Sequence, residues 1–170
     1  MTALALRGLY LGAVTAYAGV VLIVSLALPD RAPLHFGPSG EADSYGSPGQ
    51  VALVFVVVGV VLVLVLAAGG WVARRGSTAW LNVTAKDWWT ANPEREQTMR
   101  TMLAADLHAV GTATFLLLAA LVALLGRAAR DDTGLGSAFW VLLGVYLVAV
   151  LGWALYSARV RYRPTSTDVG

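Results

Sequence analysis

The chain has 170 residues, of which 58% are hydrophobic and 13% are charged, with a formal net charge of +2 and no cysteine. Soluble domains carry about 25% charged residues, so this composition excludes an ordinary soluble globule, and the small net charge gives no reason to expect a nucleic-acid partner. The lack of cysteine excludes disulfides, thiolate metal sites and cysteine nucleophiles. We therefore expect an integral membrane protein, a single membrane domain over residues 1–170 with the lipid bilayer as its first partner.

Four apolar stretches are long enough to cross a bilayer, which takes about 20 residues of α-helix. They cover residues 8–28, 51–73, 107–125 and 137–158. Helix is the expected structure even for the second stretch, which is rich in valine, because an open sheet edge does not survive in lipid. The sequence thus predicts an all-α fold, an integral membrane four-helix bundle.

The first stretch has a rival interpretation as a secretory signal peptide, because Ser25-Leu26-Ala27 resembles a cleavage site. The apolar core of a signal peptide is about 7–15 residues long, which is shorter than this stretch. We therefore interpret it as a membrane span.

Small residues recur at regular spacing on the first and fourth spans. The two rows are Gly8, Gly12 and Ala16 on the first span, and Gly136, Gly144 and Gly152 on the fourth. Such rows let helix backbones approach closely. We interpret the first row as packing within the bundle, with a dimer motif in a homo-oligomer as the alternative, and the second row as one face for close packing.

The first connecting loop, residues 29–50, is the only long polar segment between two almost purely apolar blocks. Its prolines and glycines exclude a regular helix. A loop of this length is either functional or disordered. Leu34, Phe36 and Tyr45 supply apolar anchors, so we expect an ordered cap on the bundle.

Three titratable residues, His35, Glu41 and Asp43, lie in this loop. Histidine and carboxylates suit a divalent metal such as zinc or manganese. Loops rich in glycine and proline seldom hold three ligands in place, so we favour a structural cap in which the acids cap turns. We expect no bound metal and no cofactor.

The second loop, residues 74–106, carries three tryptophans, Trp80, Trp88 and Trp89, among charged residues. Tryptophans at this level are more typical of an interfacial anchor than of a ligand cage. From Pro93 the pattern becomes helical, because Asn92 suits the N-cap and proline suits the first helical position. This helix is expected to run into the third span.

A short turn, residues 126–136, joins the last two spans, and a basic tail, residues 159–170, follows the fourth span. Three tail arginines, Arg159, Arg161 and Arg163, lie beside the membrane, where each attracts anionic lipid by about 1 kcal/mol.

Orientation follows from the distribution of basic residues. The first residues, the second loop and the tail hold nine lysines and arginines, whereas the first and third loops hold three. Basic residues accumulate on the cytoplasmic side. We therefore expect both termini and the loop 74–106 in the cytoplasm, and the loop 29–50 outside.

Catalysis and transport are poorly supported, because no span carries a charged residue in its middle, where proton relays and ion pathways place them. Asp106 and His108 lie two apart on a helix and so face different ways. We expect no enzymatic activity.

Two separated motifs carry a resemblance to a known family. The first comprises Leu28-Pro29-Asp30, Pro33-Leu34-His35-Phe36 and Gly40-Glu41-Ala42-Asp43; the second comprises Asn82, Lys86, Asp87, Trp88 and Trp89, followed by Pro93, Glu94 and Arg95. Together they resemble the N-terminal module, domain of unknown function 1648, of bacterial SdpI-type membrane proteins, over roughly residues 1–125. The chain departs from that pattern at Ser47-Pro48, where the family usually has a lysine, and at Thr84, where it has a proline.

The resemblance implies a multi-pass protein of the bacterial plasma membrane. The SdpI type is linked with immunity to a secreted peptide toxin and with sequestering a transcriptional repressor. We therefore expect a membrane interaction protein of the immunity or signalling type, whose outer loop recognises a peptide or a membrane-protein partner. The alternative is an accessory or stabilising subunit of another membrane complex, such as a transporter.

Overall fold

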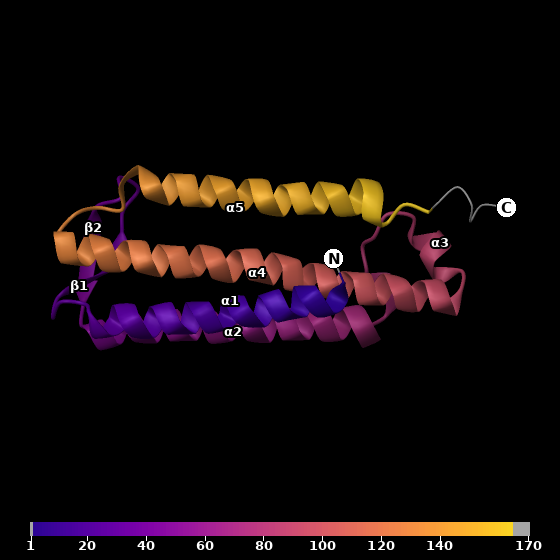
Figure 1. Cartoon of the computed structure of the whole chain (residues 1–170), viewed down its shortest axis with the longest axis horizontal. Coiled ribbons are helices and arrows are strands. Elements are labelled where there is room, and N and C mark those ends of the chain that lie inside the picture. The colour runs from indigo at the N-terminus through magenta and orange to yellow at the C-terminus, as the bar shows by residue number, and fades with distance from the viewer. Residues whose placement is uncertain (1, 165–170) are drawn as a thin grey trace.

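The computed structural model describes residues 2–164, most of which form four long helices lying side by side (Figure 1). The long helices are α1 (Ala3–Leu26), α2 (Pro48–Arg75), α4 (Pro93–Asp131) and α5 (Gly136–Tyr156). The shorter elements are β1 (Ala32–Phe36), β2 (Ala42–Gly46), a 3₁₀ turn (Thr78–Trp80), α3 (Lys86–Thr90) and a π-helical turn (Ser157–Arg161). All four long helices are apolar and long enough to cross a membrane, which confirms the prediction of four such helices.

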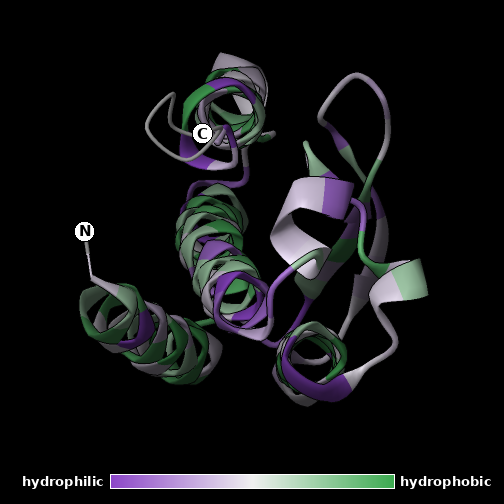
Figure 2. Cartoon of the chain, turned by 90° about the vertical axis from the view of Figure 1, so that its right-hand side faces the viewer, coloured by the Kyte–Doolittle hydropathy of each residue, from purple (hydrophilic) through white to green (hydrophobic). Residues whose placement is uncertain are grey.

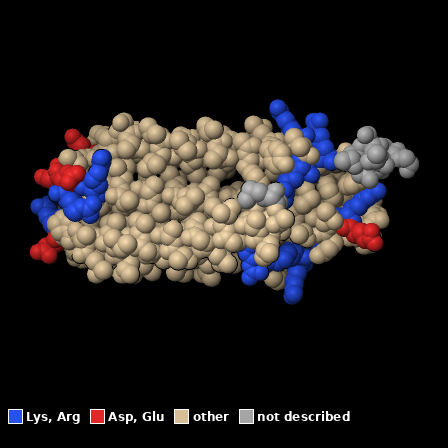
Figure 3. All heavy atoms as spheres, in the orientation of Figure 1, with Lys and Arg blue, Asp and Glu red and all other residues tan. Residues whose placement is uncertain are grey.

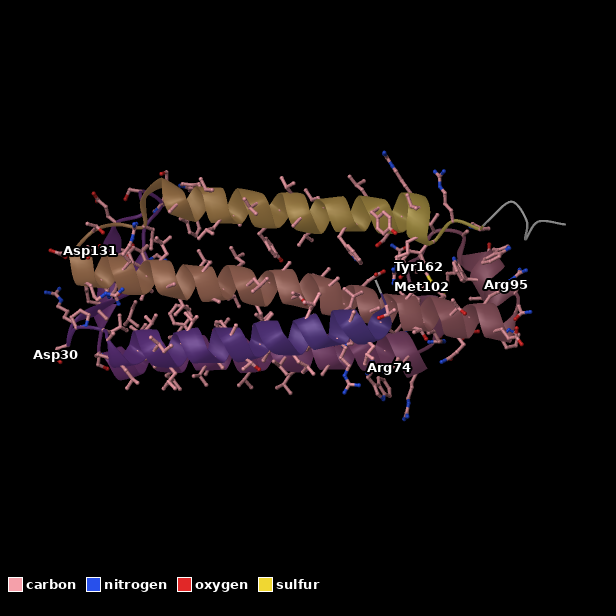
Figure 4. All side chains as sticks on the ribbon, viewed as in Figure 1. Asp30, Arg74, Arg95, Met102, Asp131 and Tyr162 are labelled. Atoms are coloured by element: carbon pink, nitrogen blue, oxygen red, sulfur yellow. The ribbon has the colours of Figure 1, made fainter. Side chains whose placement is uncertain are left out.

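Charged side chains gather at the two ends of the molecule (Figure 3). On the visible face, a wide middle band holds no Lys, Arg, Asp or Glu, and Figure 2 colours most of the long helices as hydrophobic. Among the labelled residues of Figure 4, Asp30 and Asp131 lie at the end that carries the strands, and Arg74, Arg95 and Tyr162 lie toward the other. An apolar band between two charged ends is the surface that a bilayer requires.

Helix α4 occupies the centre of the fold, between α5 and the pair α1–α2 (Figures 1 and 2). Phe115 of α4 is fully buried and meets the rings of Tyr10 and Tyr17 edge-on, at centroid distances of 6.0 and 5.4 Å. The Tyr17 hydroxyl donates a hydrogen bond to the Phe55 carbonyl of α2 at 2.5 Å. These contacts tie α1, α2 and α4 into one packed unit.

Helix α5 departs from the predicted four-helix bundle. It packs along α4, and none of the residues Gly136–Tyr156 is buried. One polar contact near its middle joins the Tyr146 hydroxyl to Thr114 Oγ1 of α4 at 3.2 Å. The sequence could not show this arrangement, because a helix that is apolar all round does not indicate which face meets a neighbour.

The interpretation of the row Gly8, Gly12 and Ala16 as packing within the bundle is wrong, and the glycines of α5 have no close neighbour among the described residues either. A Cβ atom added at Gly8, Gly12, Gly136, Gly144 or Gly152 would meet no atom of residues 2–164 within 4 Å. The close approaches occur at other glycines instead. A Cβ at Gly59 would lie 2.6 Å from Tyr17 Cε1, and one at Gly126 would lie 2.6 Å from Val24 Cγ1.

The start of α4 confirms the predicted helix beginning. The Asn92 side chain accepts hydrogen bonds from the backbone N–H groups of Glu94 and Arg95, at 2.8 and 3.5 Å, and Pro93 is the first helical residue. The predicted turn over residues 126–136 is too long, because α4 continues to Asp131 before Asp132 ends it at a φ of 49°.

The first loop forms an antiparallel hairpin, which the all-α prediction omitted. Ala32 at the start of β1 is fully buried and packs with Val51 of α2 and Leu125 of α4. The hairpin turn is closed by a hydrogen bond from the Gly37 N–H to the Glu41 carbonyl at 2.9 Å. Strand β1 contains a proline, and the two short strands pair in an irregular register. Their sequences therefore lack the regular alternation of apolar and polar residues that predicts a strand.

Candidate functional sites at the two ends of the helices

The hairpin presents an exposed pair of polar side chains. His35 of β1 donates from Nδ1 to Asp43 Oδ1 of β2 at 2.6 Å, and the two side chains are 69% and 53% exposed. An exposed pair of this kind contributes only about 0–1 kcal/mol to stability. The pair is therefore not needed to hold the hairpin together and is accessible to a ligand.

The metal hypothesis required Glu41 to join this pair. Glu41 instead lines a separate cavity with Arg31 and Asp132. Within residues 2–164, no three His, Asp or Glu side chains lie close enough together to hold a metal ion. The proposed set of His35, Glu41 and Asp43 is thus not assembled.

An apolar groove of about 520 Å³ lies beside His35, between the hairpin, α4 and the start of α5. The residues that line it include Leu34 and Phe36 of the hairpin, Phe55 of α2, Leu121 and Leu125 of α4, and Phe139 and Trp140 of α5. His35 is the one ionisable residue in this lining. Such a groove suits an apolar side chain that is oriented by one polar group at the rim.

A backbone hydrogen bond fixes one wall of the groove. The Leu135 N–H, just before α5, donates to the Gly40 carbonyl at 2.9 Å. A Cβ added at Gly134 would lie 2.6 Å from that same carbonyl oxygen, so this approach requires glycine. The hairpin is thereby attached to the loop between α4 and α5.

The residues of the outer motif thus divide into two groups. Pro33 is buried, Phe36 is half-buried against the helix ends, and Gly40 adopts a φ of 82° in the turn, so these three build the hairpin. His35, Glu41 and Asp43 remain exposed. Of the six residues of the outer motif, only His35 and Asp43 pair with each other through their side chains.

One residue of the inner motif, Trp89, is part of a small hydrophobic core. Trp89 of α3 is buried with Leu81, Met99 and Tyr162, and its indole N–H donates to the Tyr162 carbonyl at 3.1 Å. The interpretation of Trp89 as an interfacial anchor is therefore wrong, because α3 folds back on α4 and places this side chain in a small core. Trp80, by contrast, is 78% exposed.

The other residues of the inner motif lie in the loop before α3, in α3 itself and in the first turn of α4. The Arg95 guanidinium lies 4.1 Å from the centre of the Trp88 ring. Lys86 donates to the Ala79 carbonyl at 3.4 Å, and Asp87 lies in the first turn of α3. Asn82, Pro93 and Glu94 are exposed, the last two in the first turn of α4.

Sequence reasoning missed a buried polar cluster at the same end. The Tyr162 hydroxyl donates to Asp106 Oδ2 at 2.6 Å, and Arg161 Nε lies 3.2 Å from Asp106 Oδ1 (Figure 4 labels Tyr162). Burial raises the pKa of Tyr162, and the hydrogen bond to the Asp106 carboxylate raises it further. This phenol is therefore a hydrogen-bond donor at every physiological pH.

The cluster corrects the expectation for the basic tail. Arg161 was expected to attract lipid, but its side chain is 17% exposed and pairs with Asp106. Arg159 and Arg163 are exposed, as that expectation requires. The rest of the predicted tail, residues 165–170, lies outside the described residues. The sequence shows Asp106 near the start of an apolar span and Arg161-Tyr162 after the last span. A single sequence does not indicate that residues so far apart are in contact.

Fold and sites together define a multi-helix protein of the membrane type, with a hairpin at one end and a tryptophan–tyrosine core at the other. Residues 12–60 match the family model described as a domain of unknown function, DUF1648. The match spans most of α1, the hairpin and the start of α2, so it contains the outer motif and not the inner one. No curated protein and no solved structure matches the chain. The resemblance to the SdpI type therefore stays a prediction.

Proposed function

We propose that this chain is a non-catalytic protein of the bacterial plasma membrane whose hairpin recognises a polypeptide outside the cell, in an interaction of the immunity or signalling type. The observation that carries this proposal is the exposed His35–Asp43 pair at the rim of an apolar groove of about 520 Å³. An extended peptide can bind such a surface with one apolar side chain in the groove and its backbone along a strand edge.

The exposure of β2 supports this binding mode. Its three central residues, Asp43, Ser44 and Tyr45, are exposed, whereas β1 begins with two buried residues. The outer edge of β2 therefore offers backbone groups to an added strand, next to the polar pair. The excess of basic residues at the opposite end supports an outward-facing hairpin.

We predict that Asp43→Ala, or His35→Ala, weakens recognition about tenfold without removing the protein from the membrane, because the exposed pair contributes little to folding. The measurement is the survival of cells that express each variant under a titrated secreted peptide toxin. Ser39→Ala, at the exposed hairpin turn, is the matched control and should protect as well as the original chain. Unchanged survival with both variants would remove the immunity interpretation.

Orientation can be measured independently, because the chain has no cysteine. A membrane-impermeant maleimide applied to intact cells should label Ser39→Cys and spare Ser77→Cys. The reverse pattern would place the hairpin in the cytoplasm and exclude an extracellular peptide as its partner.

One observation favours the second function, an accessory subunit of a larger membrane complex. The glycines of α5 face open space, and none of the residues Gly136–Tyr156 is buried, so this helix has room for a partner helix. We expect Gly144→Leu to leave the isolated chain folded and to dissociate it from such a complex on a native gel. Gly59→Leu, by contrast, should unfold the chain itself, because the new side chain would collide with Tyr17. A complex that is insensitive to Gly144→Leu would argue against this function.

A further inference from the structure

At the end opposite the hairpin, two adjoining cavities of about 540 and 580 Å³ lie between α1, α2 and α4. Arg7 of α1, Arg74 of α2 and His108 of α4 line both of them. The second cavity adds Arg75 and Arg100. We refer to these five residues and the space that they enclose as the basic cleft.

The basic cleft has an unbalanced positive charge. Neither cavity is lined by an Asp or Glu from residues 2–164. Arg100 is neutralised by Glu96, whose Oε1 lies 2.8 Å from Arg100 Nε, and it also donates to the Ala73 carbonyl. In the described part of the chain, Arg7 and Arg74 have no acidic partner within 4.0 Å.

His108 adds a second, independent observation. Its Nδ1 atom is buried and has no hydrogen-bond partner among residues 2–164. The ring lies 5.4 Å from the ring of Tyr10, on the wall that the two cavities share. A buried polar atom without a partner costs about 1–3 kcal/mol, so the wall that the two cavities share keeps an unfilled hydrogen-bonding position beside the arginines.

The backbone of α2 allows Arg74 to approach the cleft. A Cβ added at Gly70 would lie 3.3 Å from Arg74 Nη1, so the guanidinium folds back over the glycine one turn earlier. Gly70 itself lines the first cavity. A larger residue at Gly70 would push the guanidinium away from this position.

The walls indicate which anion fits. Beyond the arginines, the first cavity continues along apolar side chains of α1 and α2, including Leu11, Val63 and Leu66. A small inorganic anion would leave these walls unused, whereas the acyl chains of a lipid would cover them. Arginines bind phosphate with paired hydrogen bonds, and basic pockets between membrane helices suit anionic lipid headgroups.

We propose that the basic cleft binds the phosphate of an anionic phospholipid, with Arg7 and Arg74 as the phosphate ligands and the acyl chains along the apolar wall of α1 and α2. This site is separate from the hairpin and does not depend on the function proposed for it.

The test compares two variants with the same change in net charge. Arg7→Gln/Arg74→Gln removes the two phosphate ligands, and Arg127→Gln/Arg130→Gln removes two exposed arginines at the hairpin end, outside the cleft. Binding of phosphatidylglycerol and of phosphatidylcholine to the purified full chain is measured by native mass spectrometry. The original chain and the Arg127→Gln/Arg130→Gln variant should retain phosphatidylglycerol in preference to phosphatidylcholine, and the cleft variant should bind phosphatidylglycerol at least tenfold more weakly.

Two results would overturn the proposal. One is equal retention of the two lipids by the original chain, or an equal loss in the two variants, which would show that net charge alone attracts the lipid. The other is protection against thermal unfolding by inorganic phosphate to the same extent as by phosphatidylglycerol, which would assign the cleft to a free anion. Arg74→Lys keeps the charge but not the paired hydrogen bonds, and we expect intermediate affinity from a variant that folds normally.

Discussion

Trp89→Ala is expected to destabilise the chain by about 3–5 kcal/mol, the usual range for removing a buried tryptophan from a core. Trp89 is 7% exposed, packs with Leu81, Met99 and Tyr162, and holds the Tyr162 carbonyl through its indole N–H. Removal of the Trp89 side chain leaves a cavity and an unpaired Tyr162 carbonyl. The segment after α5 then loses its attachment to α3. Thermal unfolding in detergent measures the first effect, and the rate of tryptic cleavage after Arg161 measures the second.

Trp80→Ala is the matched control, because Trp80 lies in the same loop and is 78% exposed. A substitution at such a position usually changes stability by less than about 0.5 kcal/mol in either direction. The difference between the two variants separates a core tryptophan from an interfacial one. Equal losses in detergent would contradict the small core, and a loss confined to lipid membranes would restore the anchor interpretation.

Asp106→Ala is expected to lower the free energy of unfolding by about 2–4 kcal/mol. This loss is smaller than that from breaking a deeply buried ion pair, because the site retains some exposure. The Asp106 and Arg161 side chains are 15% and 17% exposed, and Asp106 also accepts the Tyr162 hydroxyl at 2.6 Å. The variant leaves a buried cation and a buried hydroxyl without their partner. Asp131→Ala, at the exposed end of the same helix, should show no comparable loss of thermal stability.

A double-mutant cycle isolates the hydrogen bond within this cluster. Tyr162→Phe removes only the hydroxyl, so the combined variant Asp106→Ala/Tyr162→Phe should be less destabilised than the two single losses added together. A coupling free energy of about 1 kcal/mol or more is expected for a hydrogen bond to a charged group. Strict additivity would show that Asp106 acts only through Arg161.

Local features of the fold could be predicted from the sequence, and non-local ones could not. The start of α4 at Asn92-Pro93 depends on residues within one helical turn, and it is confirmed. The contact between Trp89 and Tyr162 joins residues 73 positions apart. Nothing in a single sequence indicates that two such residues meet.

The candidate sites follow the same division. The titratable residues of the outer loop were recognised because they are concentrated in one polar segment, yet the pairing of His35 with Asp43, and not with Glu41, depends on the irregular register of the hairpin. The basic cleft was not recognised, because its arginines come from three different helices. The first glycine row was recognised but assigned to the wrong surface, because spacing shows that residues share a face and not what that face meets.

The length of α4 has a mechanical consequence. This helix is continuous over 39 residues, or about 58 Å at 1.5 Å per residue, which is nearly twice the thickness of the hydrocarbon core. One end supports the hairpin through Leu125, and the other end carries the core of Met99 and Trp89. A tilt of about 5° at the hairpin would therefore move the far end by about 5 Å, close to the rise of one helical turn. A small tilt of α4 at one membrane surface would therefore produce, at the other surface, a displacement comparable to the length of a side chain.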